Sequence, residues 1–389
     1  MTTALGHLKV LDLSRILAGP WASQLLADFG AQVIKVERPK TGDDTRRWGP
    51  PYMQTEDGGD SCESAYFMSA NRGKQSVCID ITTKQGQKQI HKLAAECDIV
   101  IENFKKGGAA QYHLDYATLS KINPKLVYCS ITGFGQTGPY QKRPGYDFLV
   151  QAMGGLMSIT GDPKGEPQKV GVALTDVMTG LYACVGILAS LAEREKSGLG
   201  QYIDLALLDV TAATLANQAT NYLVGDMVPK KLGNAHPNIV PYQTFATKDG
   251  HCIVAVGNDE QFIRFCRVLG LENLAQHPDY KTNSQRVKNR AQLIAVLQSQ
   301  MLSQNRDDWL ALFEQASVPA GPINTIDEVF NHPQIIAREM RVNIPHPLNK
   351  HLQLPGNPIK LSRTPVQYLR PPPMLGEHDD QVFAQFDLL

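Results

Sequence analysis

Alternation of short apolar strands with helices is the feature that most restricts the fold of this chain. Residues 8–13 (LKVLDL) predict a buried strand, residues 21–30 (WASQLLADFG) a helix ending at a glycine, and residues 32–37 (QVIKVE) a second strand. This order is a βαβ unit. Strands at residues 76–81, 98–102, 126–131 and 201–207 continue the pattern. The sequence therefore predicts an α/β fold on a doubly wound parallel sheet, with ligand loops at the carboxyl ends of its strands.

Composition shifts after residue 224. The stretch Gly225–Pro241 is rich in glycine and proline and has little periodicity, so it predicts a linker into a second domain. Residues 241–256 then predict a hairpin around an Asp-Gly turn, and three amphipathic helices follow at residues 259–269, 284–302 and 306–316.

Charge and cysteine content exclude several classes of protein. Lys plus Arg and Asp plus Glu both number 38, and no basic run is interleaved with aromatics, so no nucleic-acid partner is expected. We expect no membrane partner, because the best apolar run, residues 181–191, falls short of the ~18 residues of a membrane helix. No signal peptide is read. Seven dispersed cysteines without CxxC predict that the protein lies in the cytoplasm or another reducing compartment and forms no disulfides. Scattered histidines predict no protein-bound metal.

The loop after the first strand lacks a dinucleotide fingerprint. Residues 14–20 (SRILAGP) carry one glycine, so Glu37 is a poor imitation of a ribose-binding acid. The loop leads into a helix N-terminus with Arg15, Lys35 and Arg38 nearby in sequence, which suits an anionic ligand. Ordinary solvated charges remain the alternative.

Residues 171–182 (GVALTDVMTGLY) place Asp176 at a junction between an apolar segment and an apolar helix. One interpretation is an N-cap, since helix N-termini favour carboxylates. The other is a nucleophile, a short carboxylate that the helix end keeps ionised and that small and apolar residues surround. The local pattern does not decide between them.

Eight motifs, taken in order, resemble the class III CoA-transferases over essentially the whole chain. They are LKVLDLSRILAGP, VIKVERPKTGDDTR, ANRGKQSVCID, DIVIENF, INPKLVYCSITGFGQTGP, GYDFLVQAMGGLMSITG, GVALTDVMTGLYA and LGEH. The segments NAHPNIVPYQTF and RPPPMLGEH are most similar to the succinyl-CoA:glutarate type, which is related to the formyl-CoA:oxalate type.

The resemblance implies a mechanism and an assembly. Asp176 would attack the donor thioester and pass through a mixed anhydride and an aspartyl-CoA thioester, with coenzyme A as a substrate and no tightly bound cofactor. The implied large domain is Rossmann-like and spans residues 1–224, with residues 340–389 returning to it. The implied small domain spans residues 225–339, and two chains would thread through each other as an interlocked homodimer.

The resemblance also assigns a binding site, residue by residue. Arg38 matches the nucleotide end of CoA, residues 15–18 line the thioester region, and the remaining matches lie along the CoA arm or beside the catalytic loop. The implied CoA-binding residues are Arg15, Ala18, Arg38, Asn71, Arg72, Lys74, Asn103, Phe104, Lys105, Tyr146 and Asp147. For the second carboxylate of a dicarboxylate acceptor, the candidates are Arg15 and His236, with Leu17 also at the substrate.

Two departures from the family pattern affect the expected donor. Residues 105–113 (KKGGAAQYH) replace a PGxxxxLG segment, so phosphate contacts would fall to Lys105 and Lys106. Residues 233–240 (GNAHPNIV) stand where formyl-CoA enzymes carry a glycine run, which favours succinyl-CoA over formyl-CoA.

Two other classes compete with transfer. An α-methylacyl-CoA racemase would need acid/base groups at the α-carbon, and a tyrosine such as residue 146 is a poor general base near neutral pH, because the pKa of an unperturbed tyrosine is ~10. A non-catalytic CoA-binding protein would not need Asp176.

Overall fold

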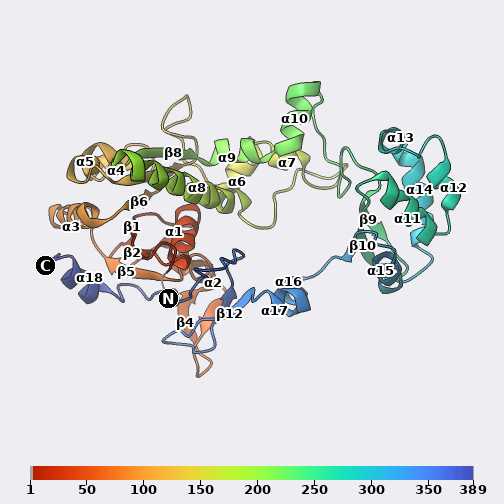
Figure 1. The fold of residues 1–389 in the computed structure, drawn as a ribbon. Coiled ribbons are helices and arrows are strands. Elements are labelled where there is room, and N and C mark those ends of the chain that lie inside the picture. Colours follow the sequence, from red (N-terminus) through yellow and green to blue (C-terminus); the bar gives the residue numbers. More distant parts are fainter. Residues whose placement is uncertain (1–2, 389) are drawn as a thin grey trace. The chain divides into compact units, whose positions relative to one another are not determined.

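The computed structural model describes residues 3–388 and contains the predicted parallel sheet. Six strands lie in the order β5–β2–β1–β6–β7–β8, and every neighbouring pair is parallel (Figure 1). The prediction of an α/β fold on a parallel sheet is confirmed. The strands are β1 (Lys9–Asp12), β2 (Gln32–Glu37), β5 (Lys74–Cys78), β6 (Ile99–Glu102), β7 (Val127–Thr132) and β8 (Tyr202–Ala206).

Each strand sends alternate side chains to opposite faces of the sheet, and helices cover both. Val10, Val33 and Ile99 pack with α1 (Ala18–Asp28) and α8 (Leu174–Ser197). On the other face, the neighbouring residues Leu11, Ile34 and Val100 join a core that includes α3 (Lys84–Glu96), α5 (Tyr116–Ile122) and α18 (Asp379–Gln385). The period of two in the sequence therefore becomes two separate cores.

Helix α8 corrects one expectation. By length and composition it could cross a membrane, with a mean hydropathy of 1.6 over an 18-residue window, whereas the sequence analysis found no apolar run of that length. The difference arises because an 18-residue window averages hydropathy over more of the helix than the apolar run at residues 181–191 covers. Half of the window is buried, and α8 packs against α1, as the core helix of a folded domain does.

Contacts divide the chain into two units, each described here by itself. The first runs up to Leu156, then through Lys169–Met227, and again from Pro333 onward. The second contains Met157–Gln168 and Val228–His332. The expected small domain, residues 225–339, was one continuous stretch and did not include residues 157–168.

The second unit has its own sheet and core. β9 (Tyr242–Ala246) and β10 (His251–Ala255) form the expected antiparallel hairpin, and β11 (Ala320–Pro322) pairs with β10. Residues 259–315 form five helices where three were expected. A short additional helix, α12, follows α11, and Asn289 divides the second expected helix into α13 and α14. The five helices are α11 (Asp259–Val268), α12 (Glu272–Gln276), α13 (Asn283–Lys288), α14 (Arg290–Met301) and α15 (Arg306–Gln315).

Shorter elements complete the described chain. A break at Leu215 separates two consecutive helices, α9 and α10. The remaining elements are η1 (Asp44–Arg47), β3 (Tyr52–Gln54), β4 (Asp60–Ser64), α2 (Ala65–Met68), α4 (Gly108–Gln111), α6 (Asp147–Met153), α7 (Leu156–Ile159), α9 (Leu207–Thr214), α10 (Ala216–Gly225), α16 (Ile326–Asn331), α17 (Pro333–Ala337), β12 (Arg341–Asn343) and β13 (Gln353–Pro355).

Candidate active site

A cavity of about 900 Å³ opens at the carboxyl ends of β1, β2, β6 and β7, within the first unit. This is the edge at which an open parallel sheet binds ligands. Its volume lies in the ~300–1,000 Å³ range of small-molecule sites. The residues predicted for the site that line it include Arg15, Leu17, Ala18, Arg38, Asn103, Phe104, Lys105, Lys106, Tyr146 and Asp176.

The loop after β1 is held in a strained conformation at the cavity wall. Ile16 has φ = 73°, in the left-handed region that β-branched residues rarely adopt. Two neighbours hold it there. The Asn103 side chain accepts from Arg15 N–H at 2.9 Å and donates to Arg15 C=O at 2.7 Å, and the Asp43 carboxylate accepts from Ile16 N–H at 3.3 Å. Asn103 therefore positions the loop, since its amide is occupied by protein.

Buried ion pairs support this loop from below. Lys35 Nζ lies 2.9 Å from Asp43, and Lys74 Nζ lies 3.2 Å from Asp12, with all four side chains fully buried. Burial opposes ionisation of Asp43, but the Lys35 ammonium and hydrogen bonds from Thr45 outweigh it and lower the pKa of Asp43 to about 2. Sequence reasoning missed Asp43, although the GDD run after β2 marked a turn with two acids.

Asp147, and not Asp176, caps helix α8. The helix begins at Leu174, which puts Asp176 inside the first turn. One carboxylate oxygen of Asp147 accepts from Thr175 N–H at 2.9 Å and from Asp176 N–H at 3.4 Å, while the other accepts from Gln151. Asp147 does not line the cavity, so its predicted contact with CoA is corrected. Its carboxylate instead accepts from N–H groups in the first turn of the helix that carries Asp176. The N-cap interpretation of Asp176 is wrong.

The half-buried Asp176 carboxyl is hard to ionise. Burial, together with the negative charge of Asp147, raises its pKa to about 7. The expectation that the helix end keeps Asp176 ionised is therefore wrong near neutral pH, because desolvation and a like charge exceed the helix-end effect. A raised pKa makes the carboxylate more basic, and hence a stronger nucleophile, once it has lost its proton.

Arginines and a third acid form the rim of the cavity. Asp44 bridges Arg15, at 2.9 Å, and Arg38. Two cations share one carboxylate, so a positive charge is left over for an anionic ligand. The two arginines lie at the ends of adjacent strands, which is how the loops after β1 and β2 bring them together.

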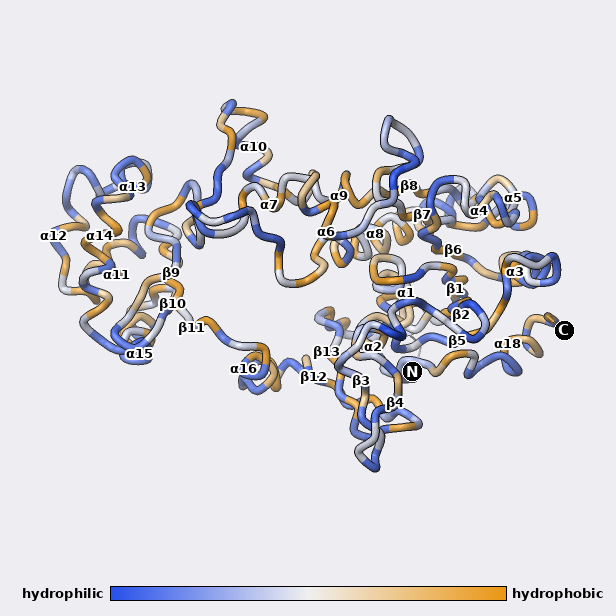
Figure 2. Tube along the Cα trace, turned by 180° about the vertical axis from the view of Figure 1, so that it is seen from behind, coloured by the Kyte–Doolittle hydropathy of each residue, from blue (hydrophilic) through white to orange (hydrophobic). Residues whose placement is uncertain are grey.

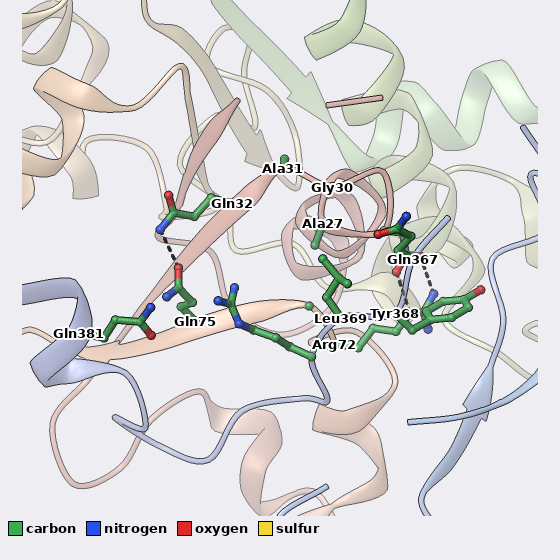
Figure 3. Close-up of a pocket in the computed structure, with 13 residues that line it drawn as sticks. Ala27, Gly30, Ala31, Gln32, Arg72, Gln75, Gln367, Tyr368, Leu369 and Gln381 are labelled. Atoms are coloured by element: carbon green, nitrogen blue, oxygen red, sulfur yellow. Dashed lines mark hydrogen bonds and ion pairs between the residues drawn. The ribbon is translucent and has the colours of Figure 1, made fainter. Parts of the chain in front are cut away.

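Asn71, Arg72 and Lys74 do not reach this cavity, and their predicted CoA contacts are corrected. Lys74 Nζ binds Asn71, Pro20 C=O and Asp12, all in the buried interior. Arg72 instead makes a bidentate pair with Asp28 and lines a separate cavity of about 230 Å³, shown with its glutamine-rich wall in Figure 3. The segment that contains Asn71, Arg72 and Lys74 resembles the family motif in sequence, but these three side chains are buried.

Two further residues complete the account. Tyr66 was not predicted, but burial first, and then the charges of Asp176, Asp147 and Asp43, raise its pKa to about 12. Its ring packs edge-on against Trp48. His236 belongs to the second unit, where its ring packs against Tyr242, so its substrate role stays a prediction.

Comparison with known proteins identifies the family. Residues 5–379 match the family described as CoA-transferase family III. The chain belongs to CoA-transferase family III. It is 49% identical over 387 residues to a succinate–glutarate CoA-transferase of Agrobacterium fabrum, covering 99% of this chain and 96% of the relative. It is 44% identical to the human succinyl-CoA:glutarate CoA-transferase, with coverage of 97% and 84%. A CAIB/BAIF family protein from Brucella suis has the same fold, with a TM-score of 0.87, 49% identity and 100% coverage of both chains.

The two acids at α8 predict a specific pH dependence. If Asp176 is the nucleophile, as the family resemblance implies, it must lose a proton to act, and kcat/KM should rise with pH through about 7. Asp147→Asn keeps an acceptor for the helix cap but removes the charge, so it should shift this rise to lower pH by roughly half a unit or more. Burial remains, so the pKa should stay above 3.8. The measurement is kcat/KM between pH 5 and 9, and Asp115→Asn, which alters the N-cap residue of α5, is the control. An unshifted profile contradicts the coupling.

Proposed function

We propose that this enzyme moves CoA from a short acyl-CoA, succinyl-CoA, to a dicarboxylate such as glutarate, with Asp176 as the nucleophile. The observation that carries the proposal is the half-buried carboxylate of Asp176, which does not cap the helix and lines a cavity of about 900 Å³ together with Arg15 and Arg38. The names of the relatives support the substrates, and a formyl-CoA:oxalate-type exchange is the alternative. In this proposal Asp176 is a nucleophile, whereas a racemase would need acid/base groups at the α-carbon of its substrate.

The proposed cycle balances without metal or redox chemistry. The Asp176 carboxylate attacks the thioester carbonyl, so the C–S bond breaks and an aspartyl–acyl anhydride and CoA thiolate form. The thiolate attacks the aspartyl carbonyl, giving an aspartyl-CoA thioester and releasing the donor acid. The acceptor carboxylate then attacks this thioester, and thiolate attack on the new acyl group regenerates Asp176. Positioning of the partners can supply ~7–11 kcal/mol of the barrier.

Burial of Asp176 supports a covalent mechanism. The environment that raises its pKa penalises the anion, and each covalent intermediate removes that charge. Forming the anhydride therefore relieves a penalty that the protein imposes on the free carboxylate. The same residue in water would lose this advantage.

The dicarboxylate assignment depends on a cation for the distal carboxylate. Arg15 lines the cavity with Asp176 and is partly exposed, so it can exchange Asp44 for a substrate. Exposed ion pairs contribute only ~0–1 kcal/mol, which makes the exchange inexpensive. We propose Arg15 as the group that reads the second carboxylate, with Arg38 at the nucleotide end of CoA.

We also propose the interlocked homodimer. Large apolar side chains are exposed along helices that belong to the first unit, including Val185 on α8 and Leu223 and Val224 on α10. In the chain trace of Figure 2, both helices contain hydrophobic stretches, coloured orange. Leu223 and Val224 are adjacent, with exposed fractions of 78% and 82%, and exposed apolar residues that are contiguous mark interaction sites. A second copy of the chain is the partner that would cover such residues.

Replacement of Asp176 tests the proposed function. Asp176→Asn keeps the size of the side chain and should abolish CoA exchange while the fold persists. Hydroxylamine added after succinyl-CoA should convert Asp176 to a hydroxamate in the native enzyme, as peptide mass spectrometry would reveal. Asp209→Asn, which changes the exposed first-turn acid of α9, is the matched control. Native-like turnover in Asp176→Asn would refute the proposal.

Arginine-to-lysine variants test acceptor specificity. Arg15→Lys should lower kcat/KM for glutarate by roughly tenfold or more, since hydrogen bonds to charged groups are worth ~1.5–3 kcal/mol and lysine does not reproduce a bidentate contact. Acetate should change much less. Arg38→Lys is the matched control, because it should raise KM for the acyl-CoA without discriminating among acceptors. An equal loss for glutarate, oxalate and acetate in Arg15→Lys means that Arg15 does not read the second carboxylate.

The assembly gives its own prediction. A threaded dimer separates only by unfolding, so mass photometry should find a dimer even at nanomolar concentration. A sample unfolded in guanidinium supplies the monomer reference. A folded monomer that appears on dilution would contradict interlocking.

A further inference from the structure

Glu102 is a buried acid beneath the cavity. It ends β6, its residue is 4% exposed, and it does not line the cavity wall. Its carboxylate accepts from Phe104 N–H at 2.7 Å. The Ser130 side chain on β7 also acts on this carboxyl as a hydrogen-bond donor that lowers its pKa. Each of these two neighbours leads to a different loop at the carboxyl edge of the sheet.

The first loop follows β6. Phe104 N–H is anchored by Glu102, and the residue between them, Asn103, clamps the backbone of Arg15. Phe104, Lys105 and Asn103 all line the cavity. The turn that presents these groups therefore depends on the acceptor that Glu102 supplies.

The second loop is the glycine-rich turn after β7, residues 133–139. Gln136 donates its side-chain amide to Ser130 Oγ at 3.0 Å, so it connects to Glu102 through one hydroxyl. Lys106 Nζ from the first loop donates to Gln136 C=O at 2.6 Å, which joins the two loops directly. Glu102, Ser130 and Gln136 thus form one link under both loops.

We propose that Glu102 is a positioning residue for CoA, which fixes the spacing between the 103–106 loop and the 133–139 loop so that the CoA arm fits between them. The inference rests on the proposed use of this cavity by CoA. An apolar side chain would fill the same space without the cost of a buried carboxyl. The acceptor oxygens are the property that an apolar residue lacks.

Among the titratable groups packed around it, Glu102 is the one whose charge changes near pH 7. Burial raises the pKa values of Tyr128 and Cys129 on β7, and that of Tyr202 on β8 to about 12, so all three are neutral near pH 7. Burial raises the pKa of Glu102 to about 7, against the hydrogen bonds from Ser130 and Phe104. The carboxylate is the better acceptor for Phe104 N–H, so CoA affinity should strengthen as pH rises through this range.

Calorimetric titration with CoA in the Asp176→Asn background tests the inference without interference from Asp176. Glu102→Leu should weaken the Kd for CoA by about tenfold, because two hydrogen bonds that order the loops are lost. Glu102→Gln keeps a hydrogen-bond acceptor and a donor in place, so its Kd for CoA should stay within about threefold of that of the parent. Because glutamine does not titrate, the contribution of residue 102 to the pH dependence of Kd should be absent from this variant. Glu96→Gln, an exposed acid at the end of α3, is the control.

Steady-state kinetics with Asp176 intact completes the test. Glu102→Leu should raise KM for succinyl-CoA with kcat within about threefold, since the nucleophile is held by other elements. If Glu102→Leu does not fold, Gln136→Leu cuts the same link farther out and should raise KM in the same direction. Unchanged CoA affinity in both variants, or a fall in kcat alone, overturns the inference. If the parent itself does not bind CoA, the proposed function fails instead.

Discussion

The buried pair of Lys35 and Asp43 is the interaction on which the cavity wall depends. Asp43 accepts from Ile16 N–H, and so holds a β-branched residue in a left-handed conformation that costs roughly 1–3 kcal/mol. It also caps η1, the turn that carries Asp44. A buried ion pair is weak support for stability in itself, so its contribution here is to fix one loop geometry. Remove Lys35, and an uncompensated carboxylate would lie under the loop.

The two aspartates near α8 divide two tasks that a single residue cannot perform together. A capping carboxylate is stabilised by N–H groups, and that stabilisation lowers its basicity. Asp147 takes the cap, so Asp176 keeps its oxygens for the cavity and is destabilised as an anion by burial and by Asp147. Because Asp147 takes the N–H groups of the helix end, Asp176 keeps the basicity that its proposed role as nucleophile needs. Asp147→Asn separates these effects, because it preserves the cap and removes the charge.

Sequence reasoning predicted what periodicity controls and missed what side-chain direction controls. The strands, the parallel sheet, the loops at its carboxyl edge and the place of Asp176 in the cavity follow from alternating apolar residues and from motif order. Arg72 and Lys74 were misplaced because a motif fixes their position along the chain, while burial at the start of β5 turns their cations toward Asp28 and Asp12. Raised pKa values, such as that of Asp176, depend on three-dimensional neighbours far apart in sequence and could not be read from spacing.

The rim explains how one cavity can take both a nucleotide-bearing thioester and a small diacid. Asp44 neutralises half of the charge on Arg15 and Arg38, so neither arginine stands as a fully unpaired cation before a ligand binds. An incoming carboxylate that displaces Asp44 exchanges one exposed ion pair for another, and the net gain comes from geometry, not from charge alone. A monocarboxylate bound at Asp176 has no second group with which to make that exchange. If Arg15 takes the second carboxylate, as proposed, discrimination by chain length would follow from the separation between Arg15 and Asp176, and the Asn103 and Asp43 clamps hold the backbone of the loop that carries Arg15.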